Sequence, residues 1–95
     1  MEDYVIEVLS ELKAEKVGKE RIRKDKDFLL TLDNEKRLVI MNKTGREIYN
    51  FCGNKVEKII KKMITLYQNV NSKKISVDVI RCLRDLEHRG FVSLR

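Results

Sequence analysis

The pattern of apolar and polar residues changes its period in the middle of the chain, between Leu38 and Gly53. Residues 38–41 form a short apolar run, Leu-Val-Ile-Met, which is typical of a buried strand. Thr44 and Glu47 follow at the spacing of a capping box, in which two side chains satisfy free backbone N–H groups at the start of a helix. Apolar residues then recur at helical spacing as far as Cys52, and Gly53 stands where a helix would end. The sequence therefore predicts a strand that leads directly into a short helix.

The N-terminal segment has a helical pattern of its own. Between residues 3 and 15, apolar side chains recur at the spacing i, i+3, i+4, i+7, namely at Val5, Val8, Leu9 and Leu12. Tyr4 and Ile6 widen this stripe, the outer face is acidic, and Gly18 is expected to end the helix. The pattern predicts an acidic amphipathic helix within residues 1–16. Its apolar stripe must be buried, so we expect the helix either to pack on its own domain or to exchange with a second copy in a homodimer.

Three short strands are predicted between this helix and the central one. The charged stretch Lys19–Asp27 suits an exposed edge strand, because charges discourage pairing with other chains, and residues 24–27 would form a turn. Phe28–Leu32 is the second predicted strand. Asp33 and Asn34 tolerate the left-handed backbone of a tight turn and would close a hairpin onto the third strand, Arg37–Met41. These strands would form a small antiparallel sheet.

Two more helices are predicted after Gly53. Asn54 and Glu57 could cap the first, which has apolar residues at helical spacing up to Tyr67 and lysines mostly on its other side. Ser76 could cap the second, which would end at Gly90 after a polar loop at 69–74. Phe91 and Val92 would turn back as a short strand. The predicted fold is α+β, with a three-stranded antiparallel sheet followed by a winged-helix-like bundle of three helices and preceded by the N-terminal helix.

The charge is distributed unevenly over the chain. The formal net charge is +6, but residues 1–15 hold one lysine and five acids, a net charge of −4, and residues 16–95 hold 20 bases and 10 acids, a net charge of +10. A basic body attracts nucleic acid, acidic peptides or acidic protein surfaces. The start Met-Glu-Asp is unlike a signal peptide, and no apolar run approaches the roughly 20 residues of a membrane span, so we expect a cytoplasmic protein.

The sequence offers little for catalysis or for a metal site. Cys52 and Cys82 both fall on apolar stripes, where cysteine usually serves packing, and His88 is the only histidine. Cys82 and His88 are six residues apart on one predicted helix, so their side chains point in different directions. There is no glycine-rich phosphate loop. An enzyme with a cysteine nucleophile is therefore the least favoured function, and no cofactor or metal is predicted.

The basic last helix leaves two kinds of binding partner open. Arg81, Arg84 and Arg89 on a helix that follows a sheet would suit a winged-helix DNA-binding regulator. However, Asp85 and Glu87 share this helix with the arginines, and it has no Asn or Gln to read adenine. We therefore favour a peptide or protein surface over nucleic acid as the partner.

The motifs in this order resemble those of the PqqD-like peptide chaperones, the RiPP recognition elements of ribosomal peptide maturation. The most specific parts are Leu38–Thr44, an apolar strand followed by Asn-x-Thr, and Asp78–Gly90 of the last helix. The similarity extends over about residues 17–95, which would form the peptide-recognition domain, with residues 1–16 as an extra helix. The sequence departs from the family after Cys52, where Gly53 and Asn54 stand in a shortened link.

The resemblance implies a domain without catalytic activity that binds the leader region of a precursor peptide and presents it to a modifying enzyme, often a radical SAM enzyme. The leader would add as a strand between the third strand and the last helix, which correspond here to residues 37–41 and 77–88. Ile80 would be an apolar contact, and two arginines would bind acidic leader residues. The candidate peptide-binding residues are Arg37, Leu38, Val39, Ile40, Met41, Ile80, Arg81 and Arg84.

Overall fold

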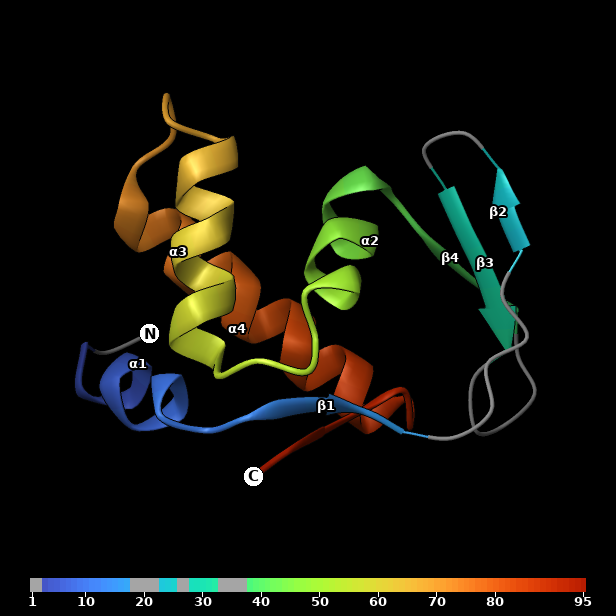
Figure 1. Ribbon diagram of the computed structural model, residues 1–95, viewed down its shortest axis with the longest axis horizontal. Helices are drawn as coiled ribbons and strands as arrows, with labels where there is room; N and C mark the ends of the chain where they lie inside the picture. Colours follow the sequence, from blue (N-terminus) through green and yellow to red (C-terminus); the bar gives the residue numbers. More distant parts are fainter. Residues whose placement is uncertain (1–2, 18–22, 26–27, 33–37) are drawn as a thin grey trace.

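The computed structural model describes residues 3–17, 23–25, 28–32 and 38–95, with the backbone alone at 23–25, 28–32 and 38–40. It has four helices and five strands within these ranges, which confirms the α+β class (Figure 1). None of the described helices is long and apolar enough to cross a membrane. In chain order, the elements are α1 Asp3–Ser10, β1 Ala14–Lys16, β2 Arg23–Asp25, β3 Phe28–Leu32, β4 Leu38–Met41, α2 Lys43–Asn50, α3 Val56–Leu66, α4 Ser72–His88 and β5 Val92–Leu94.

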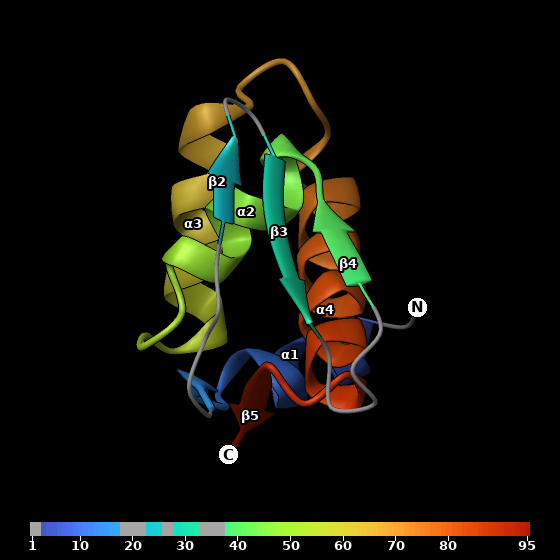
Figure 2. The ribbon, with the colours of Figure 1, turned by 90° about the vertical axis from the view of Figure 1, so that its right-hand side faces the viewer.

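The strands form two separate antiparallel sheets. One contains β2, β3 and β4 in that order, with Leu30 opposite Ile40 in the register of β3 and β4. Figure 2 shows these three strands side by side, and β3 and β4 contact α2. The other sheet pairs β1 with β5, with Ala14 opposite Leu94. The second sheet therefore joins the two ends of the described chain.

Helix α2 begins earlier than the capping-box pattern predicted. The side-chain oxygen of Asn42 accepts a hydrogen bond of 2.9 Å from the N–H of Gly45, so Asn42 and not Thr44 caps the helix. Thr44 already lies in the first turn. Asparagine is one of the strongest capping residues, and here it stands directly after β4, where the backbone is still extended. The predicted junction of strand and helix is thus confirmed, while its capping residue was wrong.

The caps predicted for the next two helices were also wrong. Helix α3 begins after Lys55, which makes no side-chain capping bond, and the side-chain amide of Asn54 instead donates to the carbonyl of Phe51. Helix α4 begins at Ser72, four residues before the predicted cap. The side chain of Asn71 caps it by accepting from the N–H groups of Lys73 and Lys74, and Ser76 donates its hydroxyl to the carbonyl of Ser72 within the helix.

The core lies among α2, α3 and α4. Helix α3 buries Val56, Ile59, Ile60 and Met63 along one side, and the long helix α4 runs behind it in Figure 1. Helix α1 contributes no buried residue. The remaining core side chains come from β1, β4, α2, α4 and the segment after α4, and they are Ala14, Met41, Ile48, Tyr49, Ile75, Val79, Ile80, Leu83, Leu86, Phe91 and Val92.

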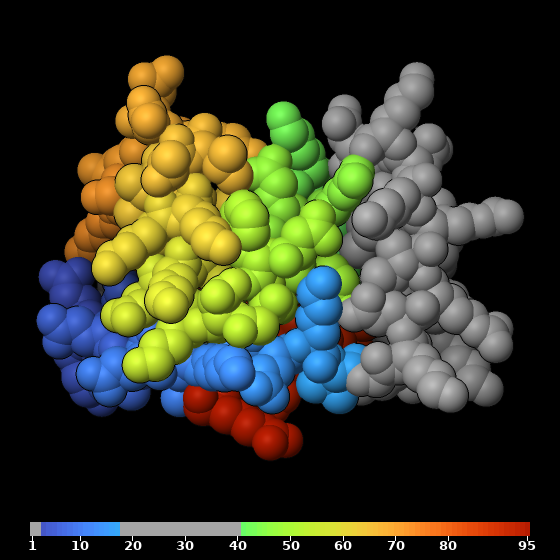
Figure 3. Space-filling model, viewed as in Figure 1, coloured from blue at the N-terminus to red at the C-terminus, as the bar shows by residue number. Residues whose placement is uncertain are grey.

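The N-terminal helix is shorter than predicted, because it ends at Ser10 and residues 14–16 form β1. Beyond its pairing with β5, Ala14 donates to the carbonyl of Asn54 and accepts from the N–H of Gly53. The strand is thus held between β5 and the link from α2 to α3, and Figure 3 shows it lying against that link. Gly53 has a positive φ of 108°, which allows the link to turn toward β1. These pairings override the helical spacing of Leu12.

Candidate functional site

The outer edge of β4 is the first candidate surface. In the order β2-β3-β4, β4 pairs with β3 on one side, and no described strand pairs with its other side (Figure 2). Unpaired N–H and C=O groups along a strand edge can bind an added strand. Leu38, Val39 and Ile40 contribute backbone to this edge, and the side chain of Met41 is buried in the core. Arg37 lies outside the described residues.

Ile80 belongs to the core and offers no open surface. Its side chain is 1 % exposed. The charged residues around Ile80 suggested an exposed face, which this position does not have, and its contact with a peptide stays a prediction. In the structure, α4 contacts α1. The ion pair between the ammonium of Lys73 and the carboxylate of Asp3, at 3.1 Å, also lies between these two helices.

The two arginines proposed for the site take different positions on α4. Arg84 lies one turn after Ile80 and borders a hollow whose other wall is α1. Arg81 is also exposed but is displaced by about 100° around the helix from Ile80. Ile80 and Arg84 therefore share the side of α4 that faces α1, and Arg81 is the candidate that remains away from it.

A small pocket that the sequence did not reveal opens between α2, α3 and α4. Its volume is about 140 Å³, and Ile48, Met63 and Val79 are among its apolar lining residues. Thr44, Lys74 and Asp78 add polar groups to the lining, and the hydroxyl of Tyr67 donates to the carboxylate of Glu47 at 3.2 Å. Because Thr44 follows β4 by only three residues, this pocket lies close to the end of the open strand edge.

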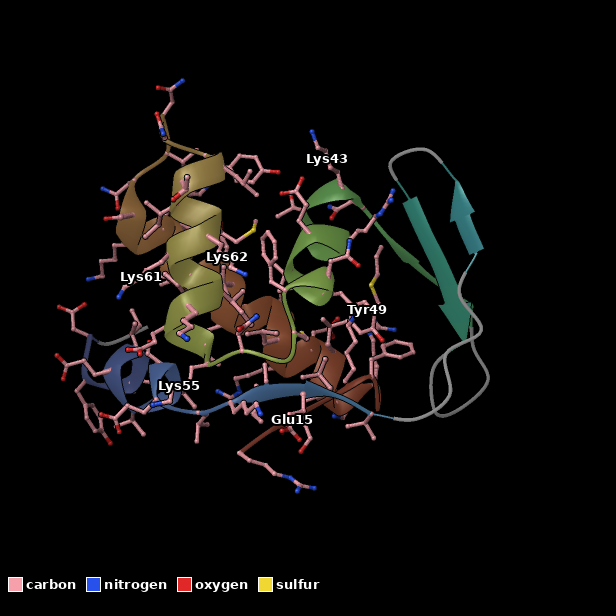
Figure 4. The ribbon with its side chains drawn as sticks, in the orientation of Figure 1. Glu15, Lys43, Tyr49, Lys55, Lys61 and Lys62 are labelled. Atoms are coloured by element: carbon pink, nitrogen blue, oxygen red, sulfur yellow. The ribbon has the colours of Figure 1, made fainter. Side chains whose placement is uncertain are left out.

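Lysines gather on a different face of the molecule. Lys55, Lys58, Lys61 and Lys62 are exposed along α3, and Figure 4 shows Lys43, Lys55, Lys61 and Lys62 on the face that it views. The ammonium of Lys62 lies 5.0 Å from the centre of the Phe51 ring, and that of Lys16 lies 4.8 Å from the Tyr49 ring. Glu15 pairs with Lys13 at 3.1 Å. This face could attract anions, but it has no open strand.

The two cysteines are not disposed for chemistry. The thiol of Cys52, directly after helix α2, donates to the carbonyl of Ile48 at 3.5 Å. Burial, together with the nearby carboxylate of Asp85, raises the pKa of Cys82 from its usual 9.0 to about 11. His88 is exposed at the end of α4. Among the described residues, no group of three or more His, Cys, Asp and Glu side chains is placed to hold a metal ion.

Cys82 should therefore react slowly with thiol reagents in the folded protein. The thiolate is the reactive form, so a pKa of about 11 in place of 9.0 lowers its population near pH 8 by about 100-fold. Alkylation by iodoacetamide, followed by peptide mass spectrometry, would measure the rate at each cysteine. The rate at Cys82 should rise with pH until about pH 11. A rate at pH 8 equal to that of the urea-unfolded chain would contradict this prediction.

The comparisons with known proteins identify the family. A model of the family described as coenzyme PQQ synthesis protein D (PqqD) matches residues 29–92, which include β3 from its second residue and all of β4, α2, α3 and α4. No curated protein and no solved structure gives a match. Helix α1 and strand β1 precede the matched segment. Because this segment is more than half of the 95 residues, the chain belongs to the PqqD family of RiPP recognition elements, as its motifs predicted.

Proposed function

We propose that this protein is a non-catalytic peptide chaperone. It binds the leader region of a ribosomally made precursor peptide through residues 17–95 and delivers it to a modifying enzyme of the radical SAM type. The observation that supports this function is the edge of β4, which no described strand covers. The order of three strands followed by three helices is compatible with a winged-helix-like fold, in which the leader would extend the sheet beyond β4.

Backbone pairing would supply the part of the affinity that does not depend on the peptide sequence, and side-chain contacts would select the leader. A peptide strand beside Leu38–Met41 can form main-chain hydrogen bonds with any sequence. Selectivity requires side-chain contacts, for which the pocket lined by Thr44, Lys74 and Asp78 offers apolar and charged groups. Arg81 could pair with an acidic leader residue. Such an exposed pair is worth about 1 kcal/mol or less, so it would adjust the choice of peptide without dominating the binding.

A titration with a candidate precursor leader peptide tests the site. In NMR spectra, the largest shifts should occur at residues 38–42 and on the side of α4 that carries Asp78 and Arg81. A second test uses a set of leaders, each N-methylated at one backbone amide. Alternate amides of an added strand point toward the sheet, so methylation of these amides should weaken binding at least several-fold, and methylation of the amides between them should not. Arg81→Glu should weaken binding several-fold, and the matched reversal Lys58→Glu on α3 should leave it unchanged.

Two results would count against this proposal. Shifts confined to the lysines of α3 would place the site on the face viewed in Figure 4. Tight binding of random duplex DNA would indicate a DNA-binding regulator instead, if the logarithm of the affinity falls steeply as the logarithm of the salt concentration rises. Leader binding should depend weakly on salt, because strand pairing and apolar contacts carry most of it.

A further inference from the structure

Helix α1 exposes apolar side chains that its own domain does not cover. Tyr4 is 68 % exposed and Val8 is 54 % exposed, and these two residues are one turn apart on the same side of the helix. None of the eight residues of α1 is buried. A helix this short has little stability without packing. The exposed pair is therefore a protruding apolar edge that would be stabilised by a partner.

A hollow lies directly beside this edge. Its volume is about 310 Å³, and α1, α4 and β5 form its walls. Most of the lining is apolar, and Leu9, Leu12 and Leu94 contribute to it together with Tyr4 and Val8 themselves. The same face of the molecule thus carries both a projection and a cavity that could receive an apolar side chain.

The charges around the hollow are also complementary. Arg84 borders the hollow and forms no ion pair with a described residue. The neighbouring acid, Glu87, already accepts a hydrogen bond of 2.9 Å from the N–H of Leu94. Glu7 on α1 and Glu11, which directly follows the helix, are exposed and likewise form no ion pair with a described residue. The face therefore offers an unpaired base at the hollow, one unpaired acid on the projecting helix and a second directly after it.

We propose that two copies of this chain associate through this face about a two-fold axis. In such an interface, each copy supplies the same patch, so the patch must contain both a feature and its complement. Tyr4 of each copy would enter the hollow of the other, and Arg84 would face the acidic side of α1 in the partner subunit. The interface is separate from β4, so the inference does not rest on the binding of a leader peptide.

Sedimentation equilibrium of the full chain tests this association. At about 100 µM the wild-type protein should sediment at close to twice the chain mass of 11.3 kDa, since a specific dimer with a dissociation constant of about 1 µM is largely formed at this concentration. Tyr4→Ala should raise the dissociation constant about 30-fold, as expected for a central aromatic anchor. Lys58→Ala, on the exposed face of α3, is the control and should leave the constant unchanged. Circular dichroism would establish that each variant is folded.

A charge reversal separates this interface from any other. Arg84→Glu should raise the dissociation constant of the dimer several-fold. The triple variant Arg84→Glu, Glu7→Lys, Glu11→Lys should restore the dissociation constant of the wild-type dimer. A monomeric wild-type protein at about 100 µM would overturn the proposal, since a specific interface with two aromatic anchors should hold at that concentration. A dimer that Tyr4→Ala leaves unchanged would overturn it as well, because the contact would then lie elsewhere.

Discussion

Removal of residues 1–16 is expected to leave the domain largely unfolded at 25 °C. The deletion removes Ala14, which is 0 % exposed, and strand β1 with it. It also breaks five backbone hydrogen bonds outside the β1–β5 pairing: one between Leu12 and Val56, two between Lys13 and Arg95, and one between Ala14 and each of Gly53 and Asn54. At about 1 kcal/mol each, these bonds account for about 5 kcal/mol, which is the lower end of the stability of a small domain.

A shorter deletion is the matched control. Removal of residues 1–10 takes away α1, which buries no residue, and leaves β1 in place. This variant should remain folded, with a lower melting temperature because α1 packs against α3 and α4. Urea titrations followed by far-ultraviolet circular dichroism would compare the free energies of unfolding. Equal stability of the two truncated chains would show that β1 contributes nothing.

Ile80→Asp should also abolish the fold. The Ile80 side chain is 1 % exposed, so the substitution places a carboxylate among apolar groups without a partner. Burial of an unpaired charge is among the few single changes that cost about 5 kcal/mol or more. Chemical denaturation should find no cooperative unfolding transition for this variant, or one shifted to very low urea concentration.

Two variants of the same helix show that the effect comes from buried charge. Ile80→Val removes one methyl group and should cost about 1 kcal/mol. Arg84→Glu changes a charge one turn later, at an exposed position, and should alter the free energy of unfolding by about 0.5 kcal/mol or less. A normal melting curve for Ile80→Asp would mean that α4 does not pack as described.

The local patterns of the sequence predicted most of the elements between residues 28 and 94. The strand at Phe28–Leu32 agrees with β3, and the strand at 37–41 agrees with β4 apart from Arg37, which lies outside the described residues. Helix starts were predicted less well, because Thr44, Asn54 and Ser76 are all capable of capping. The tertiary arrangement decides which polar side chain reaches a free N–H group. In the structure, Asn42 caps α2 and Asn71 caps α4.

The contacts between distant segments could not be predicted. Residues 14–16 fit a helical pattern, and only their pairing with β5 and the link at Gly53 makes them a strand. The face of Ile80 was misjudged for a related reason. Its neighbours Arg81 and Arg84 suggested an exposed side, whereas α1 packs against that side of α4. The pocket beside Thr44 likewise joins three helices, and no spacing within one segment indicates it.

The pairing of β1 with β5 has a consequence for folding during synthesis. Ala14 lies opposite Leu94, so nearly the whole described chain must leave the ribosome before β1 can find its partner strand. Until then, residues 14–16 can use only the link at Gly53 and Asn54, which is made about midway through the synthesis of the 95 residues. Contacts of such long sequence separation slow folding. The helices can collapse first, and the nascent domain would remain open to chaperones and proteases at β1 until β5 emerges.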